Sequence, residues 1–153
     1  MKLENYKKKR DFKKTNEPKG EILEIKDTKN KQLIFVIQRH LASHLHYDLR
    51  MEVGGVLKSW AVPKDPLLTL EGKKLLAVQV EDHPYDYKDF EGTIPEGNYG
   101  AGTVKIWDKG TYELIEKTDK SVVIKINGKK LNGTFVLLKF KPPSNWLFFK
   151  KKE

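Results

Sequence analysis

Histidine and arginine, two residue types suited to metal and phosphate chemistry, are concentrated in one short stretch of this chain. Residues 38–50 read QRHLASHLHYDLR and hold three of the four histidines and two of the three arginines. Imidazole nitrogen binds divalent metals, and the planar guanidinium group binds phosphate through two parallel hydrogen bonds. The other 27 basic residues are lysines, so a general excess of basic residues does not explain the arginines here.

Side-chain alternation along two predicted strands brings part of this stretch to one face. Successive side chains of a strand point to opposite faces, and directly opposed residues of an antiparallel pair have Cβ atoms about 5 Å apart. If the intervening residues close a simple hairpin, His40 lies opposite His46, and Gln38 lies opposite Asp48. Arg50 follows Asp48 by two residues and shares its face. The five side chains are therefore expected to form one polar patch.

Two histidines and one aspartate on one face are ligands that a divalent transition metal prefers. His40, His46 and Asp48 are the predicted metal ligands; the alternative is a pH-sensitive surface cluster. Three protein ligands leave coordination positions for water and substrate, as a catalytic metal requires. Arg50 is expected to hold a phosphate, with a salt bridge to Glu52 or Asp48 as its alternative role.

The fourth histidine, His83, lies in EDHPYDYKDFE and has two interpretations. The surrounding carboxylates favour the imidazolium form, either on an ordinary surface or as an acid or phosphate ligand presented by a loop. Tyr87 follows four residues later and would assist such a site. His44 and Arg39 have the wrong parity for the patch, so His44 is assigned to the loop or to ligand support and Arg39 receives no role.

Short runs of β-branched and aromatic residues dominate the chain and predict strands with little helix. Glycine-containing turns at 54–55, 108–110 and 127–128 suit tight hairpins, and helical turns are expected only near 41–45 and 84–90. The predicted fold class is all-β, mainly antiparallel: a small closed β-barrel with short helical turns. The predicted strands are residues 32–40, 45–53, 56–63, 74–82, 102–108, 111–116, 121–126, 133–140 and 145–150. Trp60 and Trp107 are expected in the core or an interface rather than as base-stacking platforms.

Composition narrows the class of protein further. The 153 residues are expected to form a single domain, 1–153, and the absence of cysteine excludes disulfides, cysteine-ligated zinc and thiol catalysis. No apolar run predicts a membrane span, and the start MKLENYKKKR has no apolar segment behind it, so we expect a cytoplasmic protein. The net charge of +9 lies at the ends, +5 in residues 1–20 and +4 in residues 139–153. Such ends suit a polyanion, or serve solubility alone.

Several long motifs resemble a known family. QRHLASHLHYDLRMEVGGVLKSWAVPK and LAVQVEDHPYDYKDFEGTIPEGNYGAGTVKIWDKGTYE are similar to the 3′-phosphoesterase domain of bacterial ligase D and its free-standing relatives, from about Arg10 to Lys150. The resemblance implies a closed β-barrel and a divalent-metal enzyme, typically using Mn²⁺, with Co²⁺ or Zn²⁺ as other ions for the same site. Such enzymes remove a 3′-terminal ribonucleoside and then the 3′-phosphate from DNA ends, leaving a 3′-OH.

The resemblance also implies which residues form the site. They are the metal ligands His40, His46 and Asp48, the nearby Gln38, the phosphate-contacting Arg50, His83, Lys64 and Lys74, the assisting Tyr87, and Arg10, Asp11 and Glu17 from RDFKKTNEP. On that view the basic N-terminal arm, residues 1–20, folds over the active site. His44 and Lys74 stand where family arginines are common, and a lysine lacks the guanidinium fork. With no ligase or polymerase domain here, such partners are expected in trans.

Two alternatives stay open at the level of the sequence. His46-x-Asp48 with the distant His83 formally matches the metal triad of iron-dependent oxygenases, although it leaves His40 and Arg50 without a role. The second alternative is a non-catalytic module that binds DNA ends and carries a vestigial histidine cluster.

Overall fold

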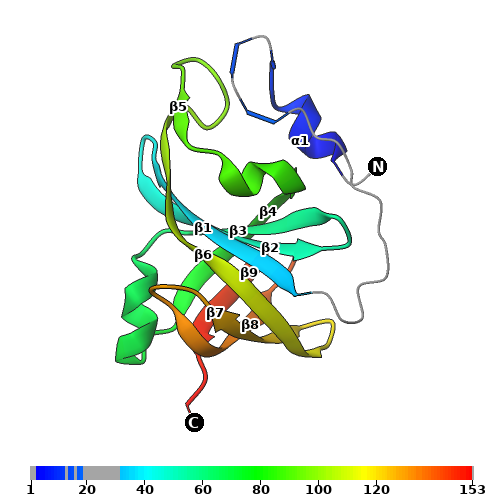
Figure 1. Cartoon of the computed structure of the whole chain (residues 1–153), viewed down its shortest axis with the longest axis vertical. Coiled ribbons are helices and arrows are strands. Elements are labelled where there is room, and N and C mark those ends of the chain that lie inside the picture. The colour runs from blue at the N-terminus through cyan, green and yellow to red at the C-terminus, as the bar shows by residue number, and fades with distance from the viewer. Residues whose placement is uncertain (1–2, 13, 16, 19–31, 153) are drawn as a thin grey trace.

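The described residues, 3–12, 14–15, 17–18 and 32–152 of a computed structural model, form an antiparallel β-barrel (Figure 1). Its strands follow the order β1-β2-β3-β4-β9-β8-β7-β6, and pairing between β1 and β6 closes the barrel. The short β5 pairs with β6. The bounds are β1 (Leu33–Leu41), β2 (Leu45–Val53), β3 (Val56–Val62), β4 (Leu75–Pro84), β5 (Gly92–Ile94), β6 (Gly102–Lys117), β7 (Ser121–Asn127), β8 (Asn132–Lys141) and β9 (Asn145–Lys150). The predicted fold class is confirmed.

Helical structure is short, as the sequence predicted. The described helices are α1 (Glu4–Lys8) and the 3₁₀ helices η1 (Pro66–Glu71) and η2 (Tyr85–Asp89). η2 confirms the helical turn predicted at 84–90. The helical turn predicted at 41–45 is wrong, because pairing of β1 with β2 continues to Leu41 and Leu45 and leaves only three residues for the connection. None of the helices in the described part of the chain has the length and apolarity needed to span a membrane.

The hairpin predicted at residues 108–110 is also wrong, since β6 continues through it as one strand of 16 residues. Asp108 and Gly110, the two residue types that suggested a turn, instead serve contacts with the connection between β7 and β8. The Asp108 carboxylate accepts hydrogen bonds from the backbone N–H of Lys129 at 2.8 Å, Lys130 at 3.2 Å and Leu131 at 3.0 Å. A Cβ at Gly110 would lie 2.1 Å from the Asn127 carbonyl oxygen. Aspartate and glycine therefore let β6 pass close to the turn between β7 and β8.

Two apolar clusters, one inside the barrel and one between the barrel and the helices α1 and η2, enclose the region of the polar patch. The first fills the barrel and includes Trp60, with Trp107 packed against it, which confirms Trp60 as a core residue. The second lies between the barrel and its cover, and is formed by Tyr6 of α1, Leu57 of β3 and Tyr87 of η2. In Figure 1, α1 and η2 lie on the same side of the barrel, above β1 to β4. The outer face of these strands is thus covered, and polar side chains on it are shielded from water.

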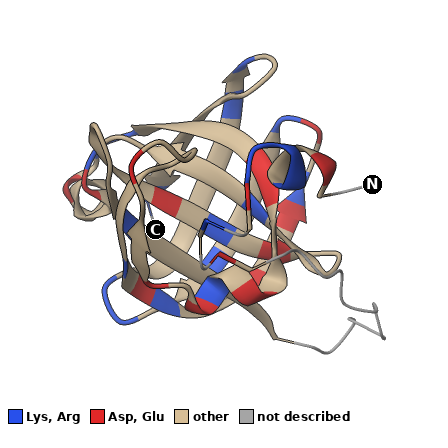
Figure 2. Ribbon diagram, turned by 90° about the horizontal axis from the view of Figure 1, so that it is seen from above, with Lys and Arg blue, Asp and Glu red and all other residues tan. Residues whose placement is uncertain are grey.

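Charge is mixed around the fold. Seen from above in Figure 2, basic and acidic residues adjoin one another around the barrel, and both signs occur on α1. Lys9, just after α1, pairs with Glu81 of β4 at 3.0 Å. Part of the basic N-terminal charge is therefore neutralised by the barrel itself.

Candidate metal centre

The pairing of β1 with β2 brings the three predicted metal ligands together. His40 is directly opposite His46, and Gln38 is directly opposite Asp48, which confirms the predicted register. One donor atom from each of His40, His46 and Asp48 lies within 4.8 Å of the others. The Asp48 carboxylate is 3.5 Å from His40 Nδ1 and 3.3 Å from His46 Nε2. Donor atoms converging in this way from two adjacent strands can hold one divalent ion.

Backbone carbonyls orient both histidines from behind. His40 Nε2 donates to the Gly100 carbonyl at 2.7 Å, and His46 Nδ1 donates to the His44 carbonyl at 3.2 Å. Each bond leaves the other ring nitrogen facing Asp48, where a bound ion would take its lone pair, as in metal-ligating histidines generally. The backbone of His44, rather than its exposed side chain, therefore supports the site. Arg39 is exposed, in keeping with having no role.

Asp48 is held in its ionised form. Burial opposes ionisation, but the Arg50 guanidinium and the hydrogen bonds from His40 and His46 outweigh it, so the pKa of Asp48 lies far below its usual value. The hydrogen bond to Asp48 also raises the pKa of His46. A carboxylate with two imidazoles is the mixed nitrogen and oxygen donor set that Mn²⁺, Co²⁺ and Zn²⁺ accept, so the residues present fit a divalent transition metal.

Arg50 lies beside the ligands and is fixed by its neighbours. Its Nε donates to Gln38 Oε1 at 2.6 Å, its Nη1 donates to Ser59 Oγ at 2.9 Å, and its Nη2 is 3.5 Å from Asp48 Oδ2. Gln38 is fully buried and donates to the carbonyls of Tyr87 at 2.8 Å and of Phe90 at 3.1 Å. Gln38 thus acts behind Arg50, linking its position to η2.

Arg10 joins the N-terminal segment to the barrel. Its Nε donates to Glu17 at 2.8 Å, and its Nη1 donates to Glu81 at 3.2 Å and to the Tyr6 carbonyl at 3.2 Å. Glu17 also accepts a hydrogen bond from the Tyr87 hydroxyl at 2.7 Å. The side chains of Arg10, Glu17 and Glu81 are only 5%, 0% and 4% exposed. The described part of the N-terminal segment therefore packs over the polar patch.

His83 differs from its sequence-based prediction in two respects. It lies in β4 rather than on a loop, and burial together with Arg50 and Arg10 lowers its pKa well below the usual value. The predicted preference for imidazolium is wrong, because burial disfavours the charged ring and the guanidinium groups of Arg50 and Arg10 repel it. Its Nδ1 donates to the Glu81 carbonyl at 2.9 Å, and its Nε2 accepts from Arg10 Nη2 at 3.2 Å. His83 is thus neutral, with both nitrogens bonded.

Comparison with known proteins shows the family to which the chain belongs. A family described as the DNA Ligase D 3′-phosphoesterase domain matches residues 38–139, a span that contains all three metal-ligand candidates. The chain belongs to this family. It is 45% identical over 163 aligned residues to the "multifunctional non-homologous end joining protein LigD" of Pseudomonas aeruginosa, covering 99% of the chain and 19% of that relative. It is 43% identical to the protein of the same name from Mycolicibacterium smegmatis, covering 99% of the chain and 21% of the relative.

A third relative extends the comparison. The "multifunctional non-homologous end joining DNA repair protein LigD" of Mycobacterium tuberculosis is 43% identical over 141 residues, covering 90% of the chain and 18% of the relative. This member of the 3′-phosphoesterase family therefore spans about a fifth of the length of the curated relatives it matches.

Five predicted site residues do not line the cleft that contains the metal ligands: Gln38 and Glu17 are buried, and Asp11, Lys64 and Lys74 are exposed. This cleft has a volume of about 280 Å³ and is lined by Arg10, His40, Ala42, His46, Asp48, Arg50, Ala61, Val80, Glu81, His83, Tyr87, Ile94, Tyr99 and Gly100. Lys74 Nζ instead lies 4.9 Å from the centre of the Phe149 ring.

Sequence reasoning missed two side chains with polar groups that line the cleft, Glu81 and Tyr99. Glu81 precedes His83 by two residues on β4, so strand parity alone would have placed it on the same face. Tyr99 and the carbonyl of Gly100 come from the segment between β5 and β6, which lies outside all the predicted strands and helical turns. No local periodicity indicates where such a segment folds.

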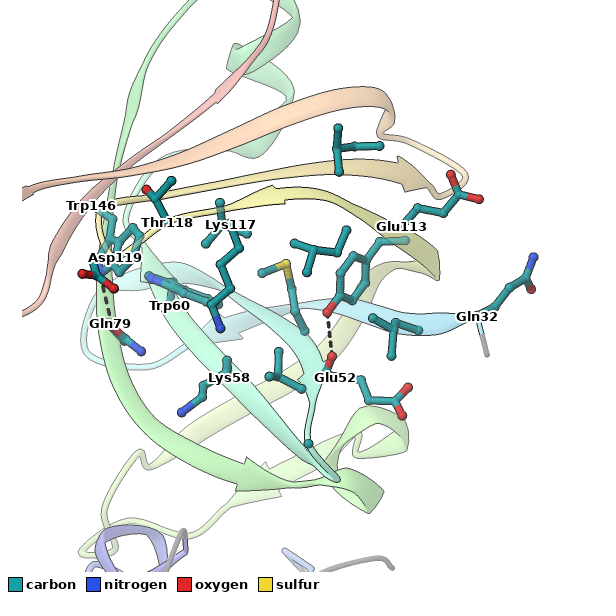
Figure 3. A pocket seen from close by; sticks show the side chains of 18 residues that line it. Gln32, Glu52, Lys58, Trp60, Gln79, Glu113, Lys117, Thr118, Asp119 and Trp146 are labelled. Carbon is teal, nitrogen blue, oxygen red and sulfur yellow. Dashed lines mark hydrogen bonds between the residues drawn. The ribbon is translucent and has the colours of Figure 1, made fainter. Parts of the chain in front are cut away.

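A larger cavity of about 920 Å³ shares no lining residue with this cleft (Figure 3). Trp60 and Trp146 form part of its wall, and Trp146 Nε1 donates to Gln79 at 3.1 Å. Lys58 at its edge pairs with Asp82 at 3.0 Å. No histidine is found among the described residues that line this cavity. Metal chemistry is therefore assigned to the smaller cleft.

Proposed function

We propose that this chain is a Mn²⁺-dependent hydrolase that repairs DNA 3′ ends. It removes a 3′-terminal ribonucleoside, and then the 3′-phosphate that remains, leaving a 3′-OH. The observation that carries the proposal is the convergence of His40, His46 and Asp48 beside Arg50 in a cleft covered by the N-terminal segment. Membership of the 3′-phosphoesterase family and the names of the relatives, which refer to non-homologous end joining, support the substrate class.

His40 Nδ1, His46 Nε2 and the Asp48 carboxylate would hold the ion, which when bound neutralises charge on a phosphate oxygen and makes water more acidic. In the first step a water oxygen bonds to phosphorus and the bond from phosphorus to the 5′-oxygen of the terminal nucleoside breaks. A water proton ends on that 5′-oxygen. The second step replaces the strand's own 3′-oxygen in the same way and releases inorganic phosphate.

Fixed charges supply the rest of the stabilisation. Arg50 lines the cleft with its guanidinium already oriented by Gln38 and Ser59, so little reorganisation is needed when a phosphate enters. Neutral His83 accepts a hydrogen bond from Arg10 and thereby positions that second guanidinium. Burial raises the pKa of Tyr87, which keeps its hydroxyl protonated as a donor to Glu17. His83 and Tyr87 therefore act as neutral positioning groups in this proposal.

The exposed residues would contact DNA beyond the cleft. Lys64 and Lys74 lie at the surface, where they would meet the strand on its way out, and Asp11 would act only indirectly. A ligase or polymerase that seals the repaired end is proposed to act in trans. In the iron-oxygenase alternative, His83 was the third ligand. The structure instead groups His40 with His46 and Asp48, and His83 is bonded to Arg10.

The test uses the purified chain and a primer–template whose primer ends in one ribonucleotide or in a 3′-phosphate. With Mn²⁺, denaturing gels should show loss of the ribonucleoside and then of the phosphate, and EDTA should stop both steps. His40→Ala, His46→Ala and Asp48→Ala should each abolish both steps. Arg39→Ala is the matched control, since Arg39 is exposed next to His40 and outside the cleft. An unchanged 3′ end in Mn²⁺, with DNA binding that persists in EDTA, would instead identify a non-catalytic end-binding module.

A further inference from the structure

Tyr99 is an aromatic residue at the cleft that the steps above do not use. It is 47% exposed although it lines the cleft that contains the metal ligands. Two cations lie against its ring: Lys9 Nζ is 4.8 Å from the ring centre, and the Arg10 guanidinium carbon is 5.3 Å from it. The ring therefore has a defined place beside the cleft and is not a free surface side chain.

The position of this ring is tied to a metal-ligand candidate. The next residue, Gly100, has a φ of +77°, which favours glycine, and its carbonyl accepts the hydrogen bond from His40 Nε2. The segment that presents Tyr99 thus also orients His40. An exposed ring held at a fixed position beside a phosphate-binding cleft is suited to stack on a nucleobase, because every base offers a flat face to an aromatic side chain.

The shape of the cleft indicates which base this is. Its volume of about 280 Å³ lies just below the range of about 300–1,000 Å³ for pockets that enclose a small molecule, so it suits one nucleotide unit better than a strand. A cleft of this size holds the reacting phosphate and one nucleoside, and the rest of the strand must lie outside it. The nucleoside that shares the cleft with that phosphate is then the terminal one, and the exposed ring of Tyr99 lines this cleft.

We infer that Tyr99 stacks on the terminal nucleoside, the group that departs in the diesterase step, and so sets the balance between the two steps. This inference rests on the proposed function. A substrate that ends in a 3′-phosphate has no such nucleoside. Loss of the ring should therefore weaken the diesterase step selectively.

The experiment compares kcat/KM for the two substrates, a 3′-ribonucleotide end and a 3′-phosphate end on the same primer–template, in Mn²⁺. Tyr99→Ala should lower the ratio of diesterase to monoesterase kcat/KM on the order of tenfold, the effect of losing one stacking contact. Tyr99→Phe should keep the wild-type ratio, because stacking needs the ring and not the hydroxyl. Leu114→Ala is the matched control: Leu114 is 48% exposed and lies outside the cleft.

The outcomes separate this inference from the proposed function. An equal loss on both substrates would place the ring against the strand rather than the terminal nucleoside and would overturn the inference. Weaker Mn²⁺ binding by Tyr99→Ala would also overturn it, since the ring would then act through Gly100 and His40. If wild-type protein processes neither end, the proposed function itself fails.

Discussion

Replacing Arg10 with methionine tests whether buried charge holds the N-terminal segment on the barrel. The substitution keeps a long side chain but removes the cation that lies 2.8 Å from Glu17 and 3.2 Å from Glu81. Breaking a buried ion pair costs about 3–5 kcal/mol, because the remaining charge stays desolvated. Glu81 keeps its contact with Lys9 at 3.0 Å, so the cost falls mainly on Glu17. We expect the free energy of unfolding to fall by about 3 kcal/mol, the lower end of that range.

Lys9→Met is the matched control. Lys9 is the neighbouring residue and pairs with the same Glu81, but its side chain is 42% exposed. Solvent screens such a pair, and exposed pairs contribute only about 0–1 kcal/mol. Arg10→Met and Lys9→Met therefore differ mainly in how deeply the removed cation is buried.

Urea-induced unfolding gives the free energies, and amide hydrogen exchange of α1 reports whether the segment opens before the barrel does. Arg10→Met should lose stability and exchange protection in α1, and Lys9→Met should lose little of either. Equal losses in the two variants would refute the reasoning. So would a loss below about 1 kcal/mol for Arg10→Met, the value expected of a solvated pair.

Three further predictions follow from other contacts. Asp108→Asn leaves one acceptor oxygen for the backbone N–H groups of residues 129–131. Because each unpaired N–H costs about 1–3 kcal/mol, this variant should unfold at a clearly lower urea concentration than the wild type. An unchanged urea midpoint would contradict the role of Asp108. Burial raises the pKa of Glu81, but the hydrogen bond from Lys9 and the charges of Lys9 and Arg10 outweigh it and hold the pKa below 4.5. The ionised carboxylate therefore contributes stability above pH 4.5 that is lost as pH falls through the lowered pKa, and the stability difference between wild type and Glu81→Gln should shrink over that interval. Finally, Mn²⁺ at about 100 times its Kd should stabilise the wild type by about 2.7 kcal/mol and leave the Tm of His46→Ala unchanged; an equal rise in both would place the ion elsewhere.

The polar patch could be predicted because strand geometry is local. Alternation with a period of two and a short connection were enough to oppose His40 to His46 and Gln38 to Asp48. The same local reasoning failed at Asp108, whose residue type suggested a turn. Its carboxylate is used by backbone groups more than 20 residues away in the sequence, and local patterns do not contain that information.

The electrostatics of the site could not be predicted for the same reason. The sequence surrounds His83 with carboxylates, whereas the fold places Arg10 and Arg50 against it. The packing of the N-terminal segment over the cleft also depends on contacts distant in the sequence, such as the hydrogen bond from Tyr87 to Glu17, 70 residues apart. Strand parity therefore predicted the candidate ligands and their register, whereas the surroundings of His83 and the position of Tyr99 beside the cleft depend on contacts between residues far apart in the sequence.

The most direct test of the central claim is anomalous diffraction from crystals soaked in Mn²⁺. The account predicts one strong peak about 2.0–2.6 Å from His40 Nδ1, His46 Nε2 and an Asp48 carboxylate oxygen, the distances at which nitrogen and oxygen bind divalent metals. A peak at other residues, or none in a crystal saturated with Mn²⁺, would contradict the assignment of these three side chains as the metal centre.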